Sequence, residues 1–347
     1  MICKQIIELL NPFKPSFLLP VCIGLLLFVG ACRSDKGEII PADDSNSIIR
    51  LQVPTGFPYP TIPADNQPTK NRIELGKKLF FDPILSRDTT ISCSSCHHTD
   101  KKFTDGLAFS NGINGNQTLR NSMSLLNCAY LPSMFWDGGI PSLEQQVLAP
   151  IESPLEMDYD INKVVARLNN DPIYTQLFLK AYKQLPSTYT LTRAIACYER
   201  TLFTSTSRFD DYLYNNITTS LNLSEKNGMI IFMGERGECF HCHGEYNFTD
   251  YSFKNNGLYL FYADSGRARI TLNQSDVGKF KVPSLRNVEF TAPYMHDGSM
   301  ATLQEVIEHY DTGGLPHPNK SGLLKPLNLT AQEKQDLVNF LKALSDQ

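Results

Sequence analysis

Apolar residues recur at helical spacing in several stretches of this 347-residue chain, whereas no stretch alternates apolar and polar residues as a half-buried strand does. The spacing predicts one helix over 72–80 and another over 224–233, which begins at Ser224 as its N-cap. Each of these two helices precedes a pair of cysteines in the sequence. The pattern therefore indicates a mainly α fold with long loops.

The C-terminal region predicts an amphipathic helix over 330–344. Thr330 and Glu333 have the spacing of a capping box, and the leucines and the phenylalanine that follow form one apolar stripe. We expect the counterpart of this helix in the first half of the chain over 192–204.

The first 31 residues have the pattern of an export signal. Residues 17–31 are almost wholly apolar and too few for a typical membrane span. Small residues precede Cys32, as in bacterial lipoprotein signals, in which the cysteine is lipidated and becomes the first residue. The alternative is an uncleaved membrane anchor. Either interpretation places the protein at the periplasmic face of a bacterial membrane, held there by a lipid anchor in the first case, with 32–68 as a flexible tether.

Composition narrows the classes of function. With 41% hydrophobic residues the chain can build a core, which excludes a disordered protein. A formal net charge of −4 argues against a nucleic-acid partner, which requires a basic surface. The chain has nine cysteines but one tryptophan, and two of the cysteines fall within the export signal.

Four of the remaining cysteines form two copies of the pattern C-x-x-C-H, which signals attachment of a c-type haem. Two thiols bind the porphyrin vinyl groups, and the following histidine is placed to ligate the iron. A zinc site or a redox C-x-x-C pair explains the histidines less well. The residues are Cys93, Cys96 and His97 in the first copy, and Cys239, Cys242 and His243 in the second.

A second repeat connects the two halves of the chain. The sequence S-L-L-N at 124–127 leads to W-D-G at 136–138, and S-L-R-N at 284–287 leads to H-D-G at 296–298 with the same spacing. This predicts two cytochrome c-like haem domains related by internal duplication. The expected divisions are a signal at 1–31, a tether at 32–68, and haem domains at 69–215 and 216–347.

From about residue 71 to residue 344 the chain resembles the bacterial di-haem cytochrome c peroxidases and the related MauG-type enzymes. Besides the haem motifs, the resemblance rests on R-N at 120–121, F-W-D-G at 135–138, L-E-M at 155–157 and L-R-N at 285–287 leading to P-Y-M-H-D-G at 293–298. It implies two covalently bound c-type haems, the N-terminal one peroxidatic and the C-terminal one transferring electrons. His97 and His243 are then the proximal iron ligands.

The resemblance also implies three catalytic residues. Trp136 matches the tryptophan that lies between the two haems, although a core aromatic is the plainer alternative. Gln146 and Glu156 match, by their offsets from Trp136, the glutamine and glutamate over the peroxidatic haem. Glu156 is expected to move a proton between the two peroxide oxygens and Gln146 to donate a hydrogen bond there. The alternative is that both are surface polar residues.

The family also has a calcium ion between its domains. Its ligands match Asn121, through the side chain, and Thr291 and Pro293, through their carbonyl groups. Oxygen donors of this kind suit calcium.

The sequence departs from the typical peroxidases at two positions. Many of them have a distal histidine where this chain has Ile113, so we expect a first haem that is open to ligands. They have a methionine ligand where this chain has Tyr310, which resembles the MauG-type enzymes. His309 and Met295 are competing ligands of the second haem. Two unassigned cysteines, Cys128 and Cys197, form either a disulfide or two buried thiols.

Three functions follow as hypotheses. The first is an exported peroxidase that reduces hydrogen peroxide with electrons from a periplasmic donor, a small cytochrome or a cupredoxin. The second is a MauG-like oxidase that acts on a protein or small molecule through a high-valent state. The third is a cytochrome that only relays electrons, which Gln146 and Glu156 argue against. By resemblance the protein is also expected to form a homodimer.

Overall fold

The computed structural model describes residues 44–347. The expected signal at 1–31, the lipidation site Cys32 and the first part of the tether lie outside these residues. Within the described residues, no helix combines the length and the apolar character that crossing a membrane requires.

The described chain is mainly helical, as expected, with one two-stranded antiparallel sheet that the sequence pattern did not predict. In that sheet Phe253 pairs with Lys281 and Lys254 with Phe280. The helices and strands are α1 (Lys70–Phe81), α2 (Leu143–Gln146), α3 (Leu148–Glu152), α4 (Ile161–Asn169), α5 (Pro172–Tyr182), α6 (Thr188–Glu199), α7 (Arg208–Tyr214), α8 (Leu223–Phe232), β1 (Phe253–Lys254), α9 (Ala268–Thr271), β2 (Phe280–Lys281), α10 (Leu303–Thr312) and α11 (Ala331–Lys342).

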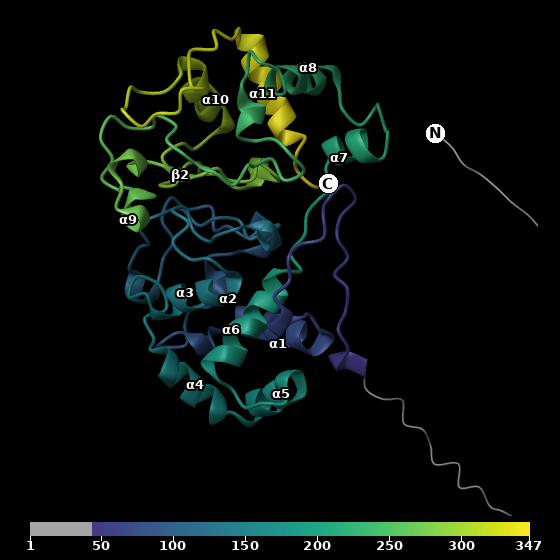
Figure 1. Cartoon of the computed structure of the whole chain (residues 1–347), viewed down its shortest axis with the longest axis vertical. Coiled ribbons are helices and arrows are strands. Elements are labelled where there is room, and N and C mark those ends of the chain that lie inside the picture. The colour runs from purple at the N-terminus through teal and green to yellow at the C-terminus, as the bar shows by residue number, and fades with distance from the viewer. Residues whose placement is uncertain (1–43) are drawn as a thin grey trace, which may run out of the picture. The chain divides into compact units, whose positions relative to one another are not determined.

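A first hydrophobic core lies among α1–α6, which gather in one half of the described chain (Figure 1). α1 begins where the Thr69 side chain accepts a hydrogen bond from the backbone of Arg72. Its closest partner is α6, and the two helices cross at Gly76. A Cβ added to Gly76 would lie 1.8 Å from the carbonyl oxygen of Ala194, so only glycine permits this approach.

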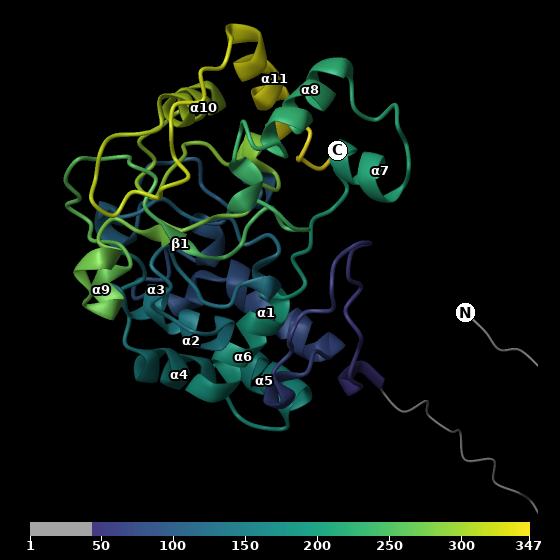
Figure 2. The ribbon, with the colours of Figure 1, turned by 45° about the horizontal axis from the view of Figure 1, so that its top comes forward.

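A second core lies among α7, α8, α10 and α11 in the other half (Figures 1 and 2). Here α8 packs on α11, and a Cβ on Gly228 would lie 2.0 Å from the carbonyl oxygen of Asp336. α7 belongs to this core through Phe209, which is 5% exposed. The C-terminus returns to the same place, because Ser207 and Asp346 form a backbone bridge.

The two halves share further local geometry. Asn127 and Asn287 both adopt left-handed backbone conformations, with φ of 58° and 60°. Isolated bridges pair Met134 with Ile140 in the first half and Tyr294 with Met300 in the second. These parallels and the two glycine crossings favour the internal duplication, which stays a prediction together with the boundary at 215.

The helix boundaries confirm one predicted cap and correct another. α11 begins after Thr330, which forms the expected capping box with Glu333. α8 begins after Asn222 rather than Ser224, because Asn222 and Glu225 exchange side-chain and backbone hydrogen bonds. The hydroxyl of Ser224 instead bonds to Asp336 of α11.

Other helices differ more from expectation. The helix expected over 192–204 is α6, which begins and ends earlier because Ser187 forms a capping box with Thr190. α4 and α5 were not predicted, although Asp160 and Asp171 cap them through their side chains. The sequence around these two helices contains no haem motif and no repeat from which a helix could be predicted.

The end of the predicted tether is fixed to the folded body. Asn66 is fully buried, and its amide nitrogen donates to Glu144 at 2.7 Å and to the carbonyl oxygen of Arg193 at 3.1 Å. Leu51 is 7% exposed. The segment also reaches the second half, because the ring of Phe57 packs against Tyr246 and lies under the guanidinium of Arg286. Within the described residues, therefore, this segment is packed against both halves rather than free.

We expect Gly76→Ala and Gly228→Ala each to destabilise the protein by about 1–3 kcal/mol or more, because the new methyl group meets a backbone carbonyl of the facing helix. Urea unfolding of the purified protein measures the change. Gly322→Ala is the control, since a Cβ there meets nothing within 4 Å, and it should change stability by no more than about 0.5 kcal/mol. Equal stability of all three variants would contradict the close helix crossings.

Candidate haem centres

The first C-x-x-C-H motif is built on a single short 3₁₀ turn. Cys93–Ser95 forms the turn, and both motif cysteines are half-buried free thiols. The Nδ1 of His97 donates to the carbonyl oxygen of Phe103 at 2.9 Å. This hydrogen bond fixes the ring and leaves Nε2 available to bind iron.

The second motif repeats this geometry. Cys239–His241 forms the turn, and the Nδ1 of His243 donates to the carbonyl oxygen of Phe248 at 3.1 Å. Burial lowers the pKa of both His97 and His243, which keeps the imidazoles neutral, as a metal ligand must be.

The four motif thiols are not activated. Burial raises the pKa of Cys96 to about 11 and that of Cys239 to about 12, and it also raises the pKa of Cys93 and Cys242. A reactive dithiol requires the opposite shift. These surroundings therefore favour thioether attachment over a redox pair of cysteines.

A cavity of about 270 Å³ adjoins the second motif. Its wall includes Cys242 and His243, and also Tyr310 and Met295, two of the three competing ligands. Burial raises the pKa of Tyr310 to about 12. His309, the third, has its Nε2 3.0 Å from the carbonyl oxygen of Asn256. The geometry thus brings Tyr310 and Met295 to the site and ties His309 to the backbone.

Trp136 comes from the first half of the chain but lines the cavity of the second motif. Its side chain is buried, and its Nε1 donates to the carbonyl oxygen of Asn121 at 2.9 Å. Its own carbonyl oxygen accepts from the backbone of Lys281 in β2 at 2.7 Å. The tryptophan is therefore held by both halves.

A buried ion-pair network fixes the turn that carries Trp136. Asp137 is fully buried and accepts from Arg120 at 2.7 Å and from Arg269 at 2.5 Å. Burial alone would raise the pKa of Asp137, but the hydrogen bond and charge of Arg120 outweigh it and lower that pKa. Arg120 also binds Asp264 through two hydrogen bonds. The sequence did not predict this network, although Arg120 lies in the R-N motif at 120–121 and Asp137 lies in the F-W-D-G motif at 135–138.

Two of the expected catalytic residues lie at the end of α2 and beyond α3: Gln146 is the last residue of α2, and Glu156 follows α3. Burial raises the pKa of Glu156, a hydrogen bond from Ser153 opposes the shift, and the Glu156 charge in turn raises the pKa of Cys93 and Cys96. The Oε1 atom of Gln146 is buried and has no hydrogen-bond partner. Both observations fit a site that is completed by a bound group.

Ile113 occupies the place where many relatives have a distal histidine. It is 1% exposed, and its backbone nitrogen donates to the carbonyl oxygen of Glu156 at 2.8 Å. The loop thus reaches Glu156 but brings an apolar side chain rather than an imidazole.

Glu199 is a buried carboxyl group that sequence reasoning missed. It is 3% exposed, its Oε2 has no partner, and burial raises its pKa to about 8. The neighbouring Arg200 pairs with Glu144 instead, at 2.6 and 2.9 Å. The Glu199 charge is the strongest electrostatic influence that raises the pKa of Cys93. Its position at the end of α6, directly before Arg200, gives no signal of this burial.

The three residues matched to a calcium site line one cavity wall. Asn121, Thr291 and Pro293 all contribute to the cavity of the second motif. The amide nitrogen of Asn121 donates to the carbonyl oxygen of Leu107 at 2.8 Å, so its amide oxygen is the atom left for a cation. Calcium binding stays a prediction.

The two unassigned cysteines are buried free thiols rather than a disulfide. Cys128 donates to the carbonyl oxygen of Glu199 at 3.3 Å, and Cys197 donates to the side chain of Asn66 at 3.1 Å. Of the two alternatives, a disulfide or two buried thiols, the structure has two buried thiols.

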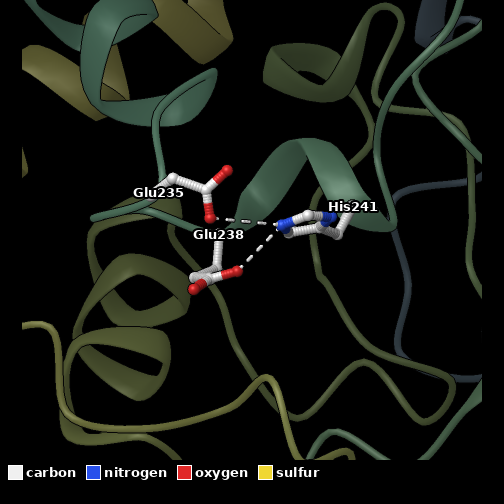
Figure 3. A group of neighbouring side chains, drawn as sticks. All are labelled: Glu235, Glu238 and His241. Atoms are coloured by element: carbon white, nitrogen blue, oxygen red, sulfur yellow. Dashed lines mark ion pairs between the residues drawn. The ribbon is translucent and has the colours of Figure 1, made fainter.

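A further cluster at the surface joins His241, within the second motif, to Glu235 and Glu238, which precede the motif (Figure 3). The Nε2 of His241 lies 3.0 Å from Glu238 and 3.7 Å from Glu235. Glu238 is also paired with Lys325 at 3.1 Å, and Glu235 is 81% exposed. The contacts are those of surface ion pairing, which accounts for the cluster without a metal.

Comparison with known proteins identifies the family of this chain. The family model described as di-haem cytochrome c peroxidase matches residues 70–218. Cytochrome-c peroxidase IdrP1 of Pseudomonas sp. strain SCT is 38% identical, over 83% of this chain and 84% of that protein. The methylamine utilization protein MauG of Methylorubrum extorquens is 35% identical, over 85% and 83%.

The chain belongs to the di-haem cytochrome c peroxidase family. It is accordingly a cytochrome-c-peroxidase-like oxidoreductase, and the family implies haem cofactors. The fold agrees: a MauG-like protein associated with microbial copper homeostasis superposes with a TM-score of 0.81 and 37% identity, covering 85% of this chain and 95% of that one. The two free thiols and the oriented histidine of each motif fit one such haem, and the cavity adjoins the second motif.

We expect the double variant Cys93→Ala, Cys96→Ala to carry one covalent haem instead of two, because each thiol pair attaches its own haem. The pyridine haemochrome spectrum and the intact mass, measured after production in a host that assembles c-type cytochromes, count the haems. Cys128→Ala removes a buried thiol outside the motifs and should retain both haems. Two haems in the double variant would exclude attachment at the first motif.

Proposed function

We propose that this protein reduces hydrogen peroxide at the N-terminal haem with electrons relayed by the C-terminal haem. The observation that carries the proposal is the half-buried Glu156 carboxyl, whose pKa is raised by burial and whose charge acts on the cysteines of the first motif. When bound, the first haem supplies an iron that can hold peroxide. The protein must supply the protons.

Glu156 is suited to this proton transfer. Its ionised form takes the proton from the inner peroxide oxygen and returns it to the outer oxygen, which leaves as water. Burial supports both steps, because it brings the pKa of the carboxyl closer to neutral pH, where giving and taking a proton are both feasible. The amide nitrogen of Gln146 is expected to donate a hydrogen bond to the same substrate, and its buried Oε1, which has no partner, can accept one.

Ile113 supports a first haem that is open to peroxide without prior reduction. A buried aliphatic side chain cannot ligate iron, so no protein ligand from this position has to leave before the substrate binds. Trp136, held by both halves, supports electron transfer between the centres.

A MauG-like oxidase is the second candidate function, and Tyr310 is the observation that favours it. A tyrosinate ligand on the second haem would favour ferric and higher oxidation states over the ferrous state. The cavity holds both Tyr310 and Met295, so the two candidate functions differ in which residue binds there. The substrate would then be a protein or a small molecule other than a cytochrome.

We also propose the setting of this activity from the sequence. The apolar segment at 17–31 and Cys32 support export and a lipid anchor at the periplasmic face of a bacterial membrane. The net charge of −4 suits an electron donor with a basic patch, a small cytochrome or a cupredoxin. The proposal also includes a calcium ion bound by Asn121, Thr291 and Pro293. It further includes a homodimer.

We expect Glu156→Gln to lower peroxide turnover by roughly 10²–10⁴-fold, because the amide cannot accept and return a proton. In the native protein kcat/KM should fall as the pH drops through the raised pKa of Glu156, at a higher pH than for an ordinary carboxyl. The steady-state rate with a reduced small cytochrome, measured against pH, checks both effects.

Glu152→Gln is the matched control for this variant, since Glu152 is an exposed glutamate at the end of α3 and should leave the rate unchanged. Native turnover in Glu156→Gln would refute the assigned role. Stopped-flow absorption after peroxide addition to the oxidised protein separates the two functions: donor-dependent turnover supports the peroxidase, and a long-lived oxidised species supports the oxidase.

We expect Tyr310→Met to raise the reduction potential of the second haem, because a thioether stabilises ferrous iron better than a phenolate does. Spectroelectrochemical titration measures the potential. Tyr294→Phe alters another tyrosine of the same cavity and should leave the potential unchanged. If Met295→Leu shifts the potential and Tyr310→Met does not, Met295 rather than Tyr310 is the ligand.

A further inference from the structure

A row of aromatic rings leads from the cavity of the second motif towards the surface. Phe280 and His296 line the cavity, and their rings are stacked with centroids 3.7 Å apart and an angle of 16°. His296 is 7% exposed. Its backbone carbonyl accepts from Asn121, the residue whose own carbonyl binds the Trp136 indole. The inner end of the row is therefore in contact with the groups that surround Trp136.

Two tyrosines continue the row outward. Tyr262 lies 6.5 Å from the His296 ring and 6.3 Å from the Phe280 ring, measured between centroids. Tyr259 lies 5.6 Å from Tyr262 and 6.5 Å from His296. These separations fall within the range of interacting aromatic pairs. We call Phe280, His296, Tyr262 and Tyr259 the aromatic row.

The outermost ring of the aromatic row has a proton acceptor in place. The hydroxyl of Tyr259 donates to the Oδ2 atom of Asp297 at 2.5 Å, a short hydrogen bond to a carboxylate. A tyrosine that loses an electron also loses its phenolic proton, so a bound carboxylate makes the oxidation easier. Tyr262 differs, since its hydroxyl interacts with the amide oxygen of Asn255 and with backbone nitrogens.

The tyrosines flank a segment that solvent reaches. Between them stand Leu260, 48% exposed, and Phe261, 90% exposed. A molecule too large to enter the cavity can therefore come close to Tyr259 while remaining outside the protein.

We propose that Tyr259, hydrogen-bonded to Asp297, is a redox-active relay residue that passes electrons from an external reductant through the aromatic row to the haem cavity. The inference rests on the proposed function, in which peroxide is the oxidant.

The relay step balances in one electron and one proton. Tyr259 gives one electron towards His296 and Phe280, and its phenolic proton moves to the Oδ2 of Asp297, which leaves a neutral tyrosyl radical and a carboxylic acid. The external reductant then returns one electron to the radical, and Asp297 returns the proton. Two such cycles supply the two electrons that reduce one peroxide, which with two further protons yields two waters.

A purely structural role is the rival explanation. Asp297 also accepts from the backbone nitrogen of Ser299, and Tyr259 could simply brace this turn. Bracing predicts a change in stability but no radical, so a spectroscopic signature separates the two explanations.

The test uses the di-haem holoprotein, mixed with one equivalent of hydrogen peroxide without reductant, freeze-quenched and examined by EPR. Protein grown on ring-deuterated tyrosine identifies a tyrosyl signal by its altered hyperfine pattern. We expect the wild type to show this signal and Tyr259→Phe to lose it. Asp297→Asn keeps an oxygen for Ser299 but is a weaker proton acceptor, and should also reduce the signal.

Tyr189→Phe is the matched control. Tyr189 is 46% exposed, and its hydroxyl lies 3.4 Å from the carboxylate of Asp65, but it stands on α6, outside the aromatic row. It should keep the full signal. An undiminished signal in Tyr259→Phe overturns the relay, as does a wild type that consumes peroxide without any tyrosyl signal, and both results leave the peroxidase proposal standing. A wild type that does not consume peroxide overturns the proposed function and the relay with it.

Discussion

The fully buried carboxylate of Asp137 is the charge on which the junction between the two halves depends. It is shared by Arg120 from its own half and Arg269 from the other, and Arg120 reaches on to Asp264. A buried charge in this position is tolerable only while its partners stay in place, and loss of one partner from such a pair typically costs about 3–5 kcal/mol. The junction is therefore stable only while Arg120 and Arg269 stay within hydrogen-bonding distance of Asp137.

The two candidate haem centres share their attachment motif but differ in the side chains that surround it. Each has a short turn that carries two thiols, followed by a histidine whose Nδ1 is held by a backbone carbonyl. Two polar side chains distinguish the first centre: Gln146, whose buried Oε1 has no hydrogen-bond partner, and Glu156, whose pKa burial raises. The cavity at the second is lined by Tyr310 and Met295, whose oxygen and sulfur atoms are of the kinds that ligate haem iron. This difference supports the proposal that substrate chemistry belongs to the first centre and electron transfer to the second.

Patterns that depend on covalent chemistry or local hydrogen bonds were readable from the sequence. The haem motifs and the Thr330 cap are of this kind, because spacing alone determines them. The predicted N-cap of α8, Ser224, was wrong. Asn222 and Ser224 both suit an N-cap position, and only the contact of Ser224 with Asp336 decides between them.

Residues whose role depends on distant partners could not be predicted in this way. The burial of Glu199 follows from helices that meet only after folding, and nothing in its immediate sequence distinguishes it from an exposed glutamate. The ion pair between Asp137 and Arg269 joins positions 132 residues apart, and the pair between Arg120 and Asp264 joins positions 144 residues apart. The family resemblance drew attention to the motif residues Arg120 and Asp137, but spacing gave no sign that they bind each other.

The position of Trp136 shows why the junction matters for function. Its indole is held by Asn121 of the first half, while its carbonyl oxygen is held by Lys281 of the second. Lys281 is itself 1% exposed, and burial, together with the charge of Arg267, lowers its pKa to about 8. Its ammonium group donates to Ser133, in the loop that leads to Trp136. The side chain and the backbone of the tryptophan are thus held by different halves, so the orientation of the indole depends on how the two halves meet.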